Sequence, residues 1–347
     1  MNRFRLLLLI LIGTAISYGF IINGNDNVST ITPIAEVNKL SVVEVEHAFG
    51  ADLPNHYIKN YDEELAKVGE ELIKVGKSSY KEHSGQRISP YFNCTDCHNL
   101  VKETEEITNL DPQDRLDYLV ENELPFAAGS TFFGIYNRSK FYNDDYYKKY
   151  GDLVTDAKDT LENAVQLCAE YCASGRKLES WELKAIMHYF KKHELKISDL
   201  GLDGTEQELI NTALSDEVNQ SEALALIQTS YVDRYHATFT GAMPENERKY
   251  GENGDPENGE KIYKSACMFC HENSRVTYLD LNDDVLSGKY LWKHREGYDD
   301  LSVYQVLRWG TYPITGRKQY MPLYTKEKMS NNQLEDLMAY IKKLENK

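Results

Sequence analysis

One five-residue pattern occurs twice in this chain, at Cys94–His98 (CTDCH) and at Cys267–His271 (CMFCH). Two cysteines three positions apart, with a histidine directly after the second, are the attachment signature of a c-type haem. Zinc would need two such cysteine pairs in one tetrahedral shell, whereas each pair here has its own histidine. The sequence therefore predicts two covalently bound haem c groups. The predicted attachment residues are Cys94, Cys97, Cys267 and Cys270, and the predicted axial iron ligands beside them are His98 and His271.

The N-terminus has the pattern of an export signal. Arg3 and Arg5 precede an apolar run from Leu6 to Ile22, and a basic start followed by such a run directs a chain across the cytoplasmic membrane. Seventeen residues are at the short end of a membrane span. Residues 1–23 are therefore predicted to be either a cleaved signal peptide or an uncleaved anchor. Either one places the protein in the periplasm or on the outer face of the membrane, where haem is attached.

The charge of the chain limits its partners. The 347 residues carry a formal net charge of −16, which argues against nucleic acid and against an anionic membrane surface as ligands. Redox proteins with basic docking surfaces are the expected partners. The hydrophobic content of 41% is ordinary, so buried cores are expected, and the length suggests two or three domains.

The predicted fold class is mainly α, with two cytochrome c-like helical domains joined by a helical linker. Leu65 to Val75 and Glu179 to Phe190 show helical spacing of apolar residues and would open and close the first domain. In the second domain a turn-rich boundary at 251–256 precedes a helix, and Asn332 to Ile341 would close the domain. Gly259 is expected to let an aromatic side chain of that closing helix approach closely. The predicted boundaries are a polar stalk at 24–56, a first domain at 57–200, a linker at 201–249 and a second domain at 250–347.

The second iron ligand decides what each haem does. In the second domain, Met321 is followed by Pro322 and comes after a loop that contains Gly310, Pro313 and Gly316. This arrangement resembles the axial methionine of class I cytochromes c. A thioether favours ferrous iron, so ligation by His271 and Met321 predicts a comparatively high potential. The other methionines of this region, Met329 and Met338, are interpreted as packing residues.

The first domain has no equivalent methionine ligand, because no methionine or histidine lies between His98 and the closing helix. The donors that remain open are Cys168, Cys172, His83, Met187 and His188. A disulfide between Cys168 and Cys172 is a further alternative, since the compartment is oxidising and the two are four positions apart.

The segment from Cys168 to Ala185 resembles the haem domain shared by bacterial thiosulfate dehydrogenases and the sulfur-oxidation cytochromes that load thiosulfate onto a carrier protein. The resemblance spans roughly residues 90–200. In that family a cysteine seven positions before a Gly-Arg or Gly-Lys pair ligates the iron, and Cys168 has this position relative to Gly175 and Arg176. The resemblance implies that Cys168 is an iron ligand and, with Arg176, a catalytic residue. The serine-methionine-asparagine stretch usual in the dehydrogenases is replaced here by Cys172-Ala173-Ser174.

These ligands predict a direction of electron flow. An anionic thiolate stabilises ferric iron and lowers the potential of the first haem, whereas methionine raises that of the second. The leading hypothesis is an electron carrier that passes electrons from the first haem to the second and on to a partner. The first alternative is an enzyme that oxidises thiosulfate at the Cys168-ligated haem, with Arg176, Lys177 or Arg138 attracting the anion. A diheme peroxidase is the second alternative.

Overall fold

The computed structural model describes residues 34–241, 243–271, 288–293, 295–296, 302–310 and 321–345. The predicted export segment at 1–23 and the loop residues 311–320 lie outside these ranges. Among the helices in the described ranges, none has both the length and the apolar character needed to cross a membrane.

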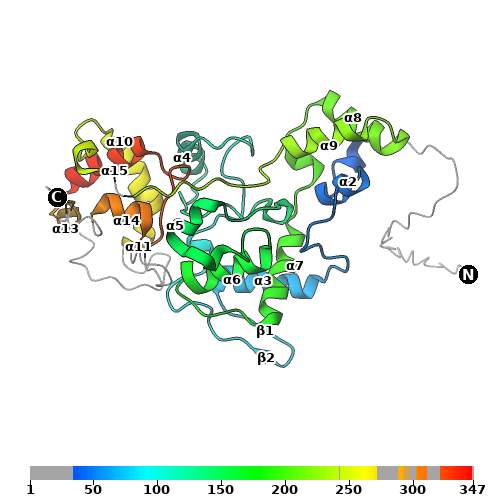
Figure 1. Cartoon of the computed structure of the whole chain (residues 1–347), viewed down its shortest axis with the longest axis horizontal. Coiled ribbons are helices and arrows are strands. Elements are labelled where there is room, and N and C mark those ends of the chain that lie inside the picture. Colours follow the sequence, from blue (N-terminus) through cyan, green and yellow to red (C-terminus); the bar gives the residue numbers. More distant parts are fainter. Residues whose placement is uncertain are drawn as a thin grey trace, which may run out of the picture.

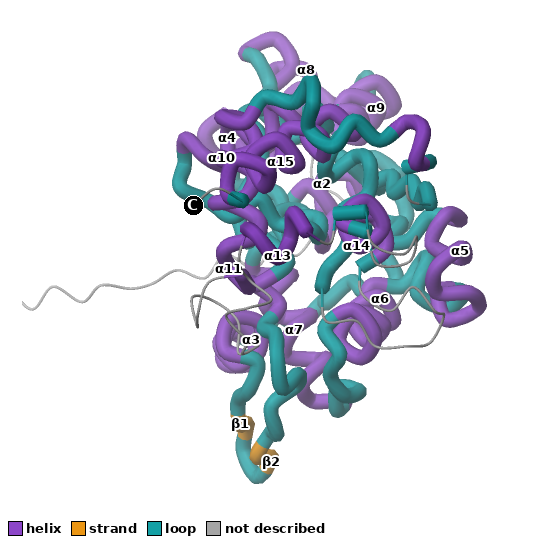
Figure 2. The backbone as a smooth tube through the Cα atoms, turned by 90° about the vertical axis from the view of Figure 1, so that its left-hand side faces the viewer, coloured by secondary structure: helices purple, strands orange, loops and turns teal. Residues whose placement is uncertain are grey.

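The prediction of a mainly helical fold is confirmed (Figure 1). The two strands in the described ranges are short: β1 (Ser79–Tyr80) pairs antiparallel with β2 (His83–Ser84). They form a hairpin that projects from the body of the molecule (Figure 2).

The first helical unit is built on two helices that cross, α3 (Glu63–Val75) and α7 (Ser180–Lys192). The carboxylate of Asp62 accepts the first free amides of α3, and Gly76 ends that helix at a φ of 74°. The chain between them contains α5 (Tyr147–Tyr150) and α6 (Leu161–Leu167). Both long helices match the apolar spacing of the sequence, because each buries one face against the other.

The second unit repeats this crossing with α10 (Pro256–Ile262) and α15 (Asn331–Leu344). A Cβ at Gly259 would lie 2.9 Å from the Cβ of Tyr340, which confirms the expected close approach of an aromatic residue. The same relation holds in the first unit, where a Cβ at Gly69 would lie 2.9 Å from the Cβ of Tyr189. The unit also contains α11 (Met268–His271), α13 (Gly288–Lys293) and α14 (Val303–Trp309).

The two units share a core. Helix α4 (Pro112–Glu121) comes from the chain of the first unit but lies beside α10 and α15 (Figure 1). Leu116, Leu119 and Phe126 belong to the same buried cluster as Ile262 and the apolar face of α15. The backbone amide of Phe126 donates to the carbonyl of Ser265 at 2.9 Å. The cores therefore do not follow the boundaries expected from sequence order.

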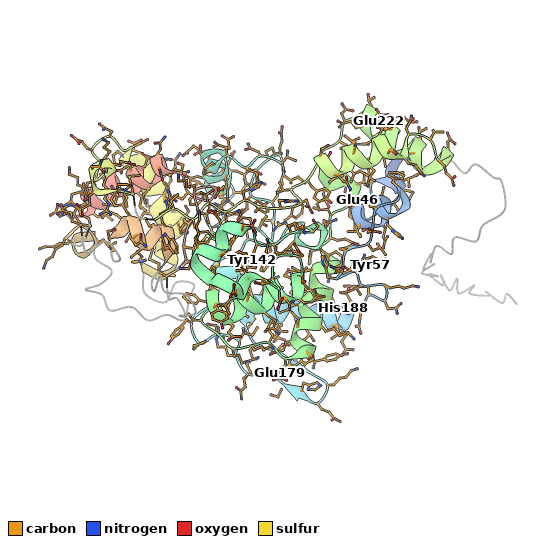
Figure 3. All side chains as sticks on the ribbon, in the orientation of Figure 1. Glu46, Tyr57, Tyr142, Glu179, His188 and Glu222 are labelled. Carbon is orange, nitrogen blue, oxygen red and sulfur yellow. The ribbon has the colours of Figure 1, made fainter. Side chains whose placement is uncertain are left out.

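A separate helical lobe lies at the other end of the molecule. It consists of α1 (Ile34–Val37), α2 (Val42–Ala48), α8 (Gly204–Asp216) and α9 (Gln220–Thr229). Figure 3 places Glu46 and Glu222 in this lobe, and Tyr142 and His188 in the first unit.

This lobe differs from the predicted polar stalk at 24–56. Val37, Val42 and Val45 are buried against Ile210 and Ile227 of the linker helices. The range 201–249, predicted to be a helical linker, contains α8 and α9. The described part of the range predicted to be a stalk contains helices of four and seven residues, which show no clear apolar period of their own.

Candidate cofactor sites

The first motif begins on a tight turn at Cys94–Asp96. The Asp96 carboxylate accepts a hydrogen bond from the Asn93 amide at 2.8 Å, and the amide of His98 donates to the carbonyl of Cys94 at 3.0 Å. Burial raises the pKa of the Cys94 thiol to about 12. Burial also raises the pKa of Cys97, with smaller contributions from Asp96 and from Cys270 of the second motif.

The imidazole of His98 is oriented as a metal ligand. Its Nδ1 lies 2.6 Å from the carbonyl oxygen of Ser130, and because a carbonyl only accepts, Nδ1 carries the proton and Nε2 keeps its lone pair. The ring stacks on Phe132 with centroids 4.4 Å apart. Burial lowers the pKa of His98 to about 4, so the ring is neutral at pH 7. Gly129 leaves room for the ring, since a Cβ there would lie 2.6 Å from Nδ1.

Beyond His98 lies a cavity of about 190 Å³ lined mostly by apolar and aromatic side chains. Both motif cysteines, His98, Cys168 and Cys172 also line it. Cys168 begins a π-helical turn, Cys168–Cys172, that follows α6. Such turns are frequent at functional sites.

The sulfur of Cys168 faces His98, with Sγ 3.9 Å from Nε2. Metal ions bind imidazole nitrogen at about 2.0 Å and thiolate sulfur at about 2.3 Å, so the two atoms are near enough for one metal ion to bind both. Two thiols for attachment, an oriented imidazole and an opposed sulfur in an apolar cavity are a donor set that fits a c-type haem.

The other donors considered for the first site differ in position. His83 belongs to the β1–β2 hairpin, and its ring stacks on that of Trp181 in α7. Met187 is buried in the first core. His188 Nδ1 accepts a hydrogen bond from the backbone amide of Asp62 at 3.0 Å. None of these three lines the cavity. Cys172 does line it, is hydrogen-bonded to Cys168, and lies 3.7 Å from the Tyr150 hydroxyl. No disulfide joins any two of the six cysteines, all of which lie in the described part of the chain.

The three cations considered for binding an anionic substrate differ in position and exposure. Arg176 donates to both carboxylate oxygens of Glu182, at 2.6 and 2.7 Å, and does not line the cavity. Lys177 is exposed. Arg138 is buried and lines the cavity. A direct role of Arg176 in substrate binding therefore has no geometric support and stays a prediction.

The second motif follows a π-helical turn at Tyr263–Cys267 and continues into α11. Burial raises the pKa of Cys267 to about 12 and lowers the pKa of His271. The Nδ1 atom of His271 is buried and has no hydrogen-bond partner within the part of the chain that is described.

Met321 is half-buried and packs against the second core, in the same region as Cys267. Met329 and Met338 are fully buried core residues, in agreement with their interpretation as packing residues. Pro313, Gly316 and the residue before Met321 lie outside the described residues.

The two motifs are close in space. Cys97 is near enough to Cys270 for the charge of Cys270 to contribute to the raised pKa of Cys97. Burial, with smaller contributions from Cys267, Cys97 and Cys270, raises the pKa of Tyr324. Tyr324 donates to the carbonyl of Phe126 at 2.9 Å. Pro322 and Leu323, the two residues after Met321, line the cavity of the first motif. The chain that follows the expected ligand of one site therefore forms part of the wall of the other.

Sequence reasoning did not single out Gly129, Ser130 and Phe132, which position the His98 ring. A backbone carbonyl that accepts a hydrogen bond and a ring that stacks leave no local sequence pattern. Only a structure brings residues some thirty positions apart to one imidazole.

Residues 254–341 match the family described as cytochrome C oxidase, cbb3-type, subunit III. This part of the chain is therefore a cytochrome c domain, which implies covalently bound haem c at the second motif and supports a haem-based role in electron transfer. The comparisons found no match among curated proteins and none among solved structures.

Proposed function

We propose that this protein is an exported diheme c-type cytochrome that passes electrons from a lower-potential haem at the first motif to a histidine/methionine haem at the second, and on to a partner. Haem supplies one-electron transfer when it is bound. At the first site the thiols of Cys94 and Cys97 would hold it, with His98 and Cys168 as iron ligands. At the second site Cys267 and Cys270 would hold it, with His271 and Met321 as ligands.

The observation that carries the proposal is the shared wall of the two sites. Pro322 and Leu323 line the first cavity directly after Met321, and Cys270 is near enough to Cys97 for its charge to contribute to the raised pKa of Cys97. Short separation is the main requirement for transfer between two redox groups in one chain. The ligands provide the direction, because a thiolate favours ferric iron and a neutral thioether favours ferrous iron.

The electrons would leave to a partner with a basic surface. The chain's net charge of −16 supports this choice, because opposite charges steer two proteins together. The predicted export segment supports a location in the periplasm or on the outer face of the cytoplasmic membrane, where such a partner would be met.

An optical redox titration of the mature protein tests the proposal. We expect two one-electron components of different potential, and we expect Met321→Leu to lower only the higher one. Met338→Leu, a change of the same kind in the buried face of α15, serves as the control and should move neither. A single component, or equal effects of the two methionine variants, would contradict the proposal.

A second candidate is thiosulfate oxidation at the first site. The observation in its favour is a cavity that presents the Cys168 sulfur together with the cations Arg138 and Lys140. Joining two thiosulfate ions into tetrathionate releases two electrons, which an artificial acceptor would take up. Turnover no faster than that of free haem would remove this candidate.

The cavity gives no support to the peroxidase alternative. A peroxidase needs an acidic group near an open iron position, and no aspartate or glutamate is among the described residues that line the first cavity. Peroxide-dependent oxidation of a reduced cytochrome would restore that alternative.

A further inference from the structure

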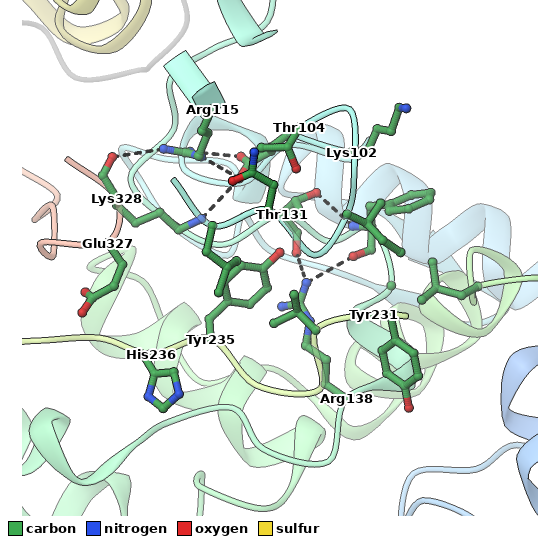
Figure 4. A pocket seen from close by; sticks show the side chains of 18 residues that line it. Lys102, Thr104, Arg115, Thr131, Arg138, Tyr231, Tyr235, His236, Glu327 and Lys328 are labelled. Carbon is green, nitrogen blue, oxygen red and sulfur yellow. Dashed lines mark hydrogen bonds and ion pairs between the residues drawn. The ribbon is translucent and has the colours of Figure 1, made fainter. Parts of the chain in front are cut away.

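Three buried basic side chains line a small cavity (Figure 4). They are Arg115 and Arg138 from the first unit and Lys328 from the second, each at most 7% exposed. The buried carboxylate among them is Glu103, which accepts from Arg115 Nε at 2.9 Å and from Lys328 Nζ at 3.2 Å. These two cations hold the pKa of Glu103 at about 2, although burial alone would raise it.

Glu103 does not balance the charge of this cluster. Burial first, and then the charge of Arg115, lowers the pKa of Lys328 to about 7. Two other carboxylates lie nearby, but each accepts hydrogen bonds from a residue outside the cluster. Glu327 is half-buried and accepts from Thr238, and Asp233 accepts from Ser139. In the described part of the chain, one buried carboxylate therefore faces two buried arginines and a lysine whose pKa is near 7.

Arg138 is the cation with the weakest compensation. Its guanidinium donates to the Ser130 hydroxyl and to the carbonyls of Thr131 and Phe133, and it stacks 4.4 Å over the Tyr235 ring. All of these partners are neutral. Burial lowers the pKa of Arg138. Glu103 and Asp233 act on Arg138 only from a distance. A buried charge without a directly paired counter-ion is costly, so an anion that is not part of the polypeptide would stabilise this arrangement.

The position of Arg138 indicates where that anion comes from. Arg138 and Tyr235 line both the large cavity of the first motif and a smaller one of about 50 Å³ that contains Arg115 and Lys328. A group bound in the large cavity can therefore reach the cluster past these two side chains. The porphyrin of haem carries two propionate side chains, each ending in a carboxylate.

We propose that the cluster is a carboxylate site that binds a propionate of the first haem, with Arg138 as its direct partner. Lys328 would add positive charge from the second unit. This inference rests on the proposed attachment of haem at Cys94 and Cys97. Positive charge held beside a haem favours the reduced iron, so the cluster raises the potential of the first haem above the value that its ligands alone would give.

The test is the midpoint potential of the first haem in Arg138→Gln. We expect the equilibrium constant for its reduction to fall about tenfold, which is about 59 mV for one electron. Arg138→Lys should recover part of the loss, because it keeps the charge. Arg234→Gln is the matched control, since Arg234 is 56% exposed, lies on the same segment as Tyr235, and should leave the potential unchanged.

The haem content of each variant, measured first by intact mass, distinguishes a failure of the proposed function from a failure of the carboxylate site. Absence of haem at the first motif in the unmodified protein would contradict the proposed function. Two haems with an unchanged potential in Arg138→Gln would overturn the carboxylate site alone. If Arg138→Gln does not accumulate, Lys328→Gln replaces it, with a smaller fall expected in the same direction and no fall overturning the site.

A free oxyanion is the other source of the same chemistry. With haem propionate in the cluster, replacing chloride by sulfate or phosphate at constant ionic strength should leave the first potential unchanged. A potential that depends on the concentration of these anions, and loses that dependence in Arg138→Gln, would assign the cluster to a free oxyanion and overturn the propionate assignment.

Discussion

The two attachment motifs lie in units with the same helix crossing, but the surroundings of their histidines differ. In each unit a glycine of the first helix contacts the last helix, with Gly69 against Tyr189 and Gly259 against Tyr340. At the first motif the imidazole is fixed by the Ser130 carbonyl and faces a sulfur. At the second, His271 Nδ1 has no partner within the described ranges, and the family match covers this half only.

This difference separates two kinds of support. The second motif lies within residues 254–341, which match the family described as cytochrome C oxidase, cbb3-type, subunit III. The proposal for the first motif rests on geometry, because the hydrogen bond to His98 Nδ1 fixes the tautomer that leaves Nε2 free to bind a metal. The two units therefore share the crossing of their first and last helices and differ in the environment of the motif histidine.

The largest expected effect comes from removing the attachment cysteines of one unit at a time. Cys94→Ala with Cys97→Ala, and Cys267→Ala with Cys270→Ala, should each lower the intact mass by one haem. Emptying the first cavity of about 190 Å³ should also cost on the order of 5 kcal/mol of unfolding free energy, at about 24 cal/mol per Å³. A first-motif variant that keeps the mass and stability of the unmodified protein would contradict the attachment of a haem at the first motif.

The shared crossing is tested by the two glycines. Gly69→Ala and Gly259→Ala each place a Cβ against the backbone of the opposite helix, and such overpacking should cost about 3 kcal/mol of unfolding free energy. Gly204→Ala is the control, because a Cβ there meets nothing within 4 Å. Denaturant unfolding should show similar losses in the first two variants and none in the third. A loss in one unit alone would show that the crossings are not equivalent.

A smaller effect is expected from the lobe that accompanies only the first unit. Burial raises the pKa of Glu46 to about 7 from an ordinary 4.5, with Tyr231 donating to its carboxylate. The folded state therefore holds a proton that the unfolded chain releases between these values, so stability falls as pH rises from 4.5 to 7.

Glu46→Gln should remove this dependence. We expect the variant to be more stable than the unmodified protein by about 2 kcal/mol at pH 8 and by little at pH 5. The exposed Glu222 of α9 provides the control variant Glu222→Gln. Parallel pH profiles for the unmodified protein and Glu46→Gln in denaturant unfolding would contradict the expectation.

The sequence predicted the parts of the fold that have a period or a motif. Helices α3, α7, α10 and α15 follow from amphipathic spacing and caps, and the close approach at Gly259 follows from the size of glycine. The equivalent approach at Gly69, the shared core around α4 and the burial of Val42 depend on contacts between distant segments. No local pattern encodes such contacts.

The candidate site divides in the same way. Both motifs, Cys168 and Met321 were named from spacing and resemblance. Arg138 was named as a possible substrate cation, and the structure places it in a buried cluster with Lys328, which is far away in sequence. Charge balance in a buried cluster depends on which segments meet, so the sequence alone could not reveal it.

We propose that the chain holds two haems with different axial ligands, one of them Cys168. Low-temperature electron paramagnetic resonance of the ferric protein and of Cys168→Ala is the decisive measurement. We expect two low-spin signals, one typical of thiolate ligation, and the loss of that signal alone in the variant. A spectrum that the substitution leaves unchanged would contradict the claim and return Cys168 to a structural role.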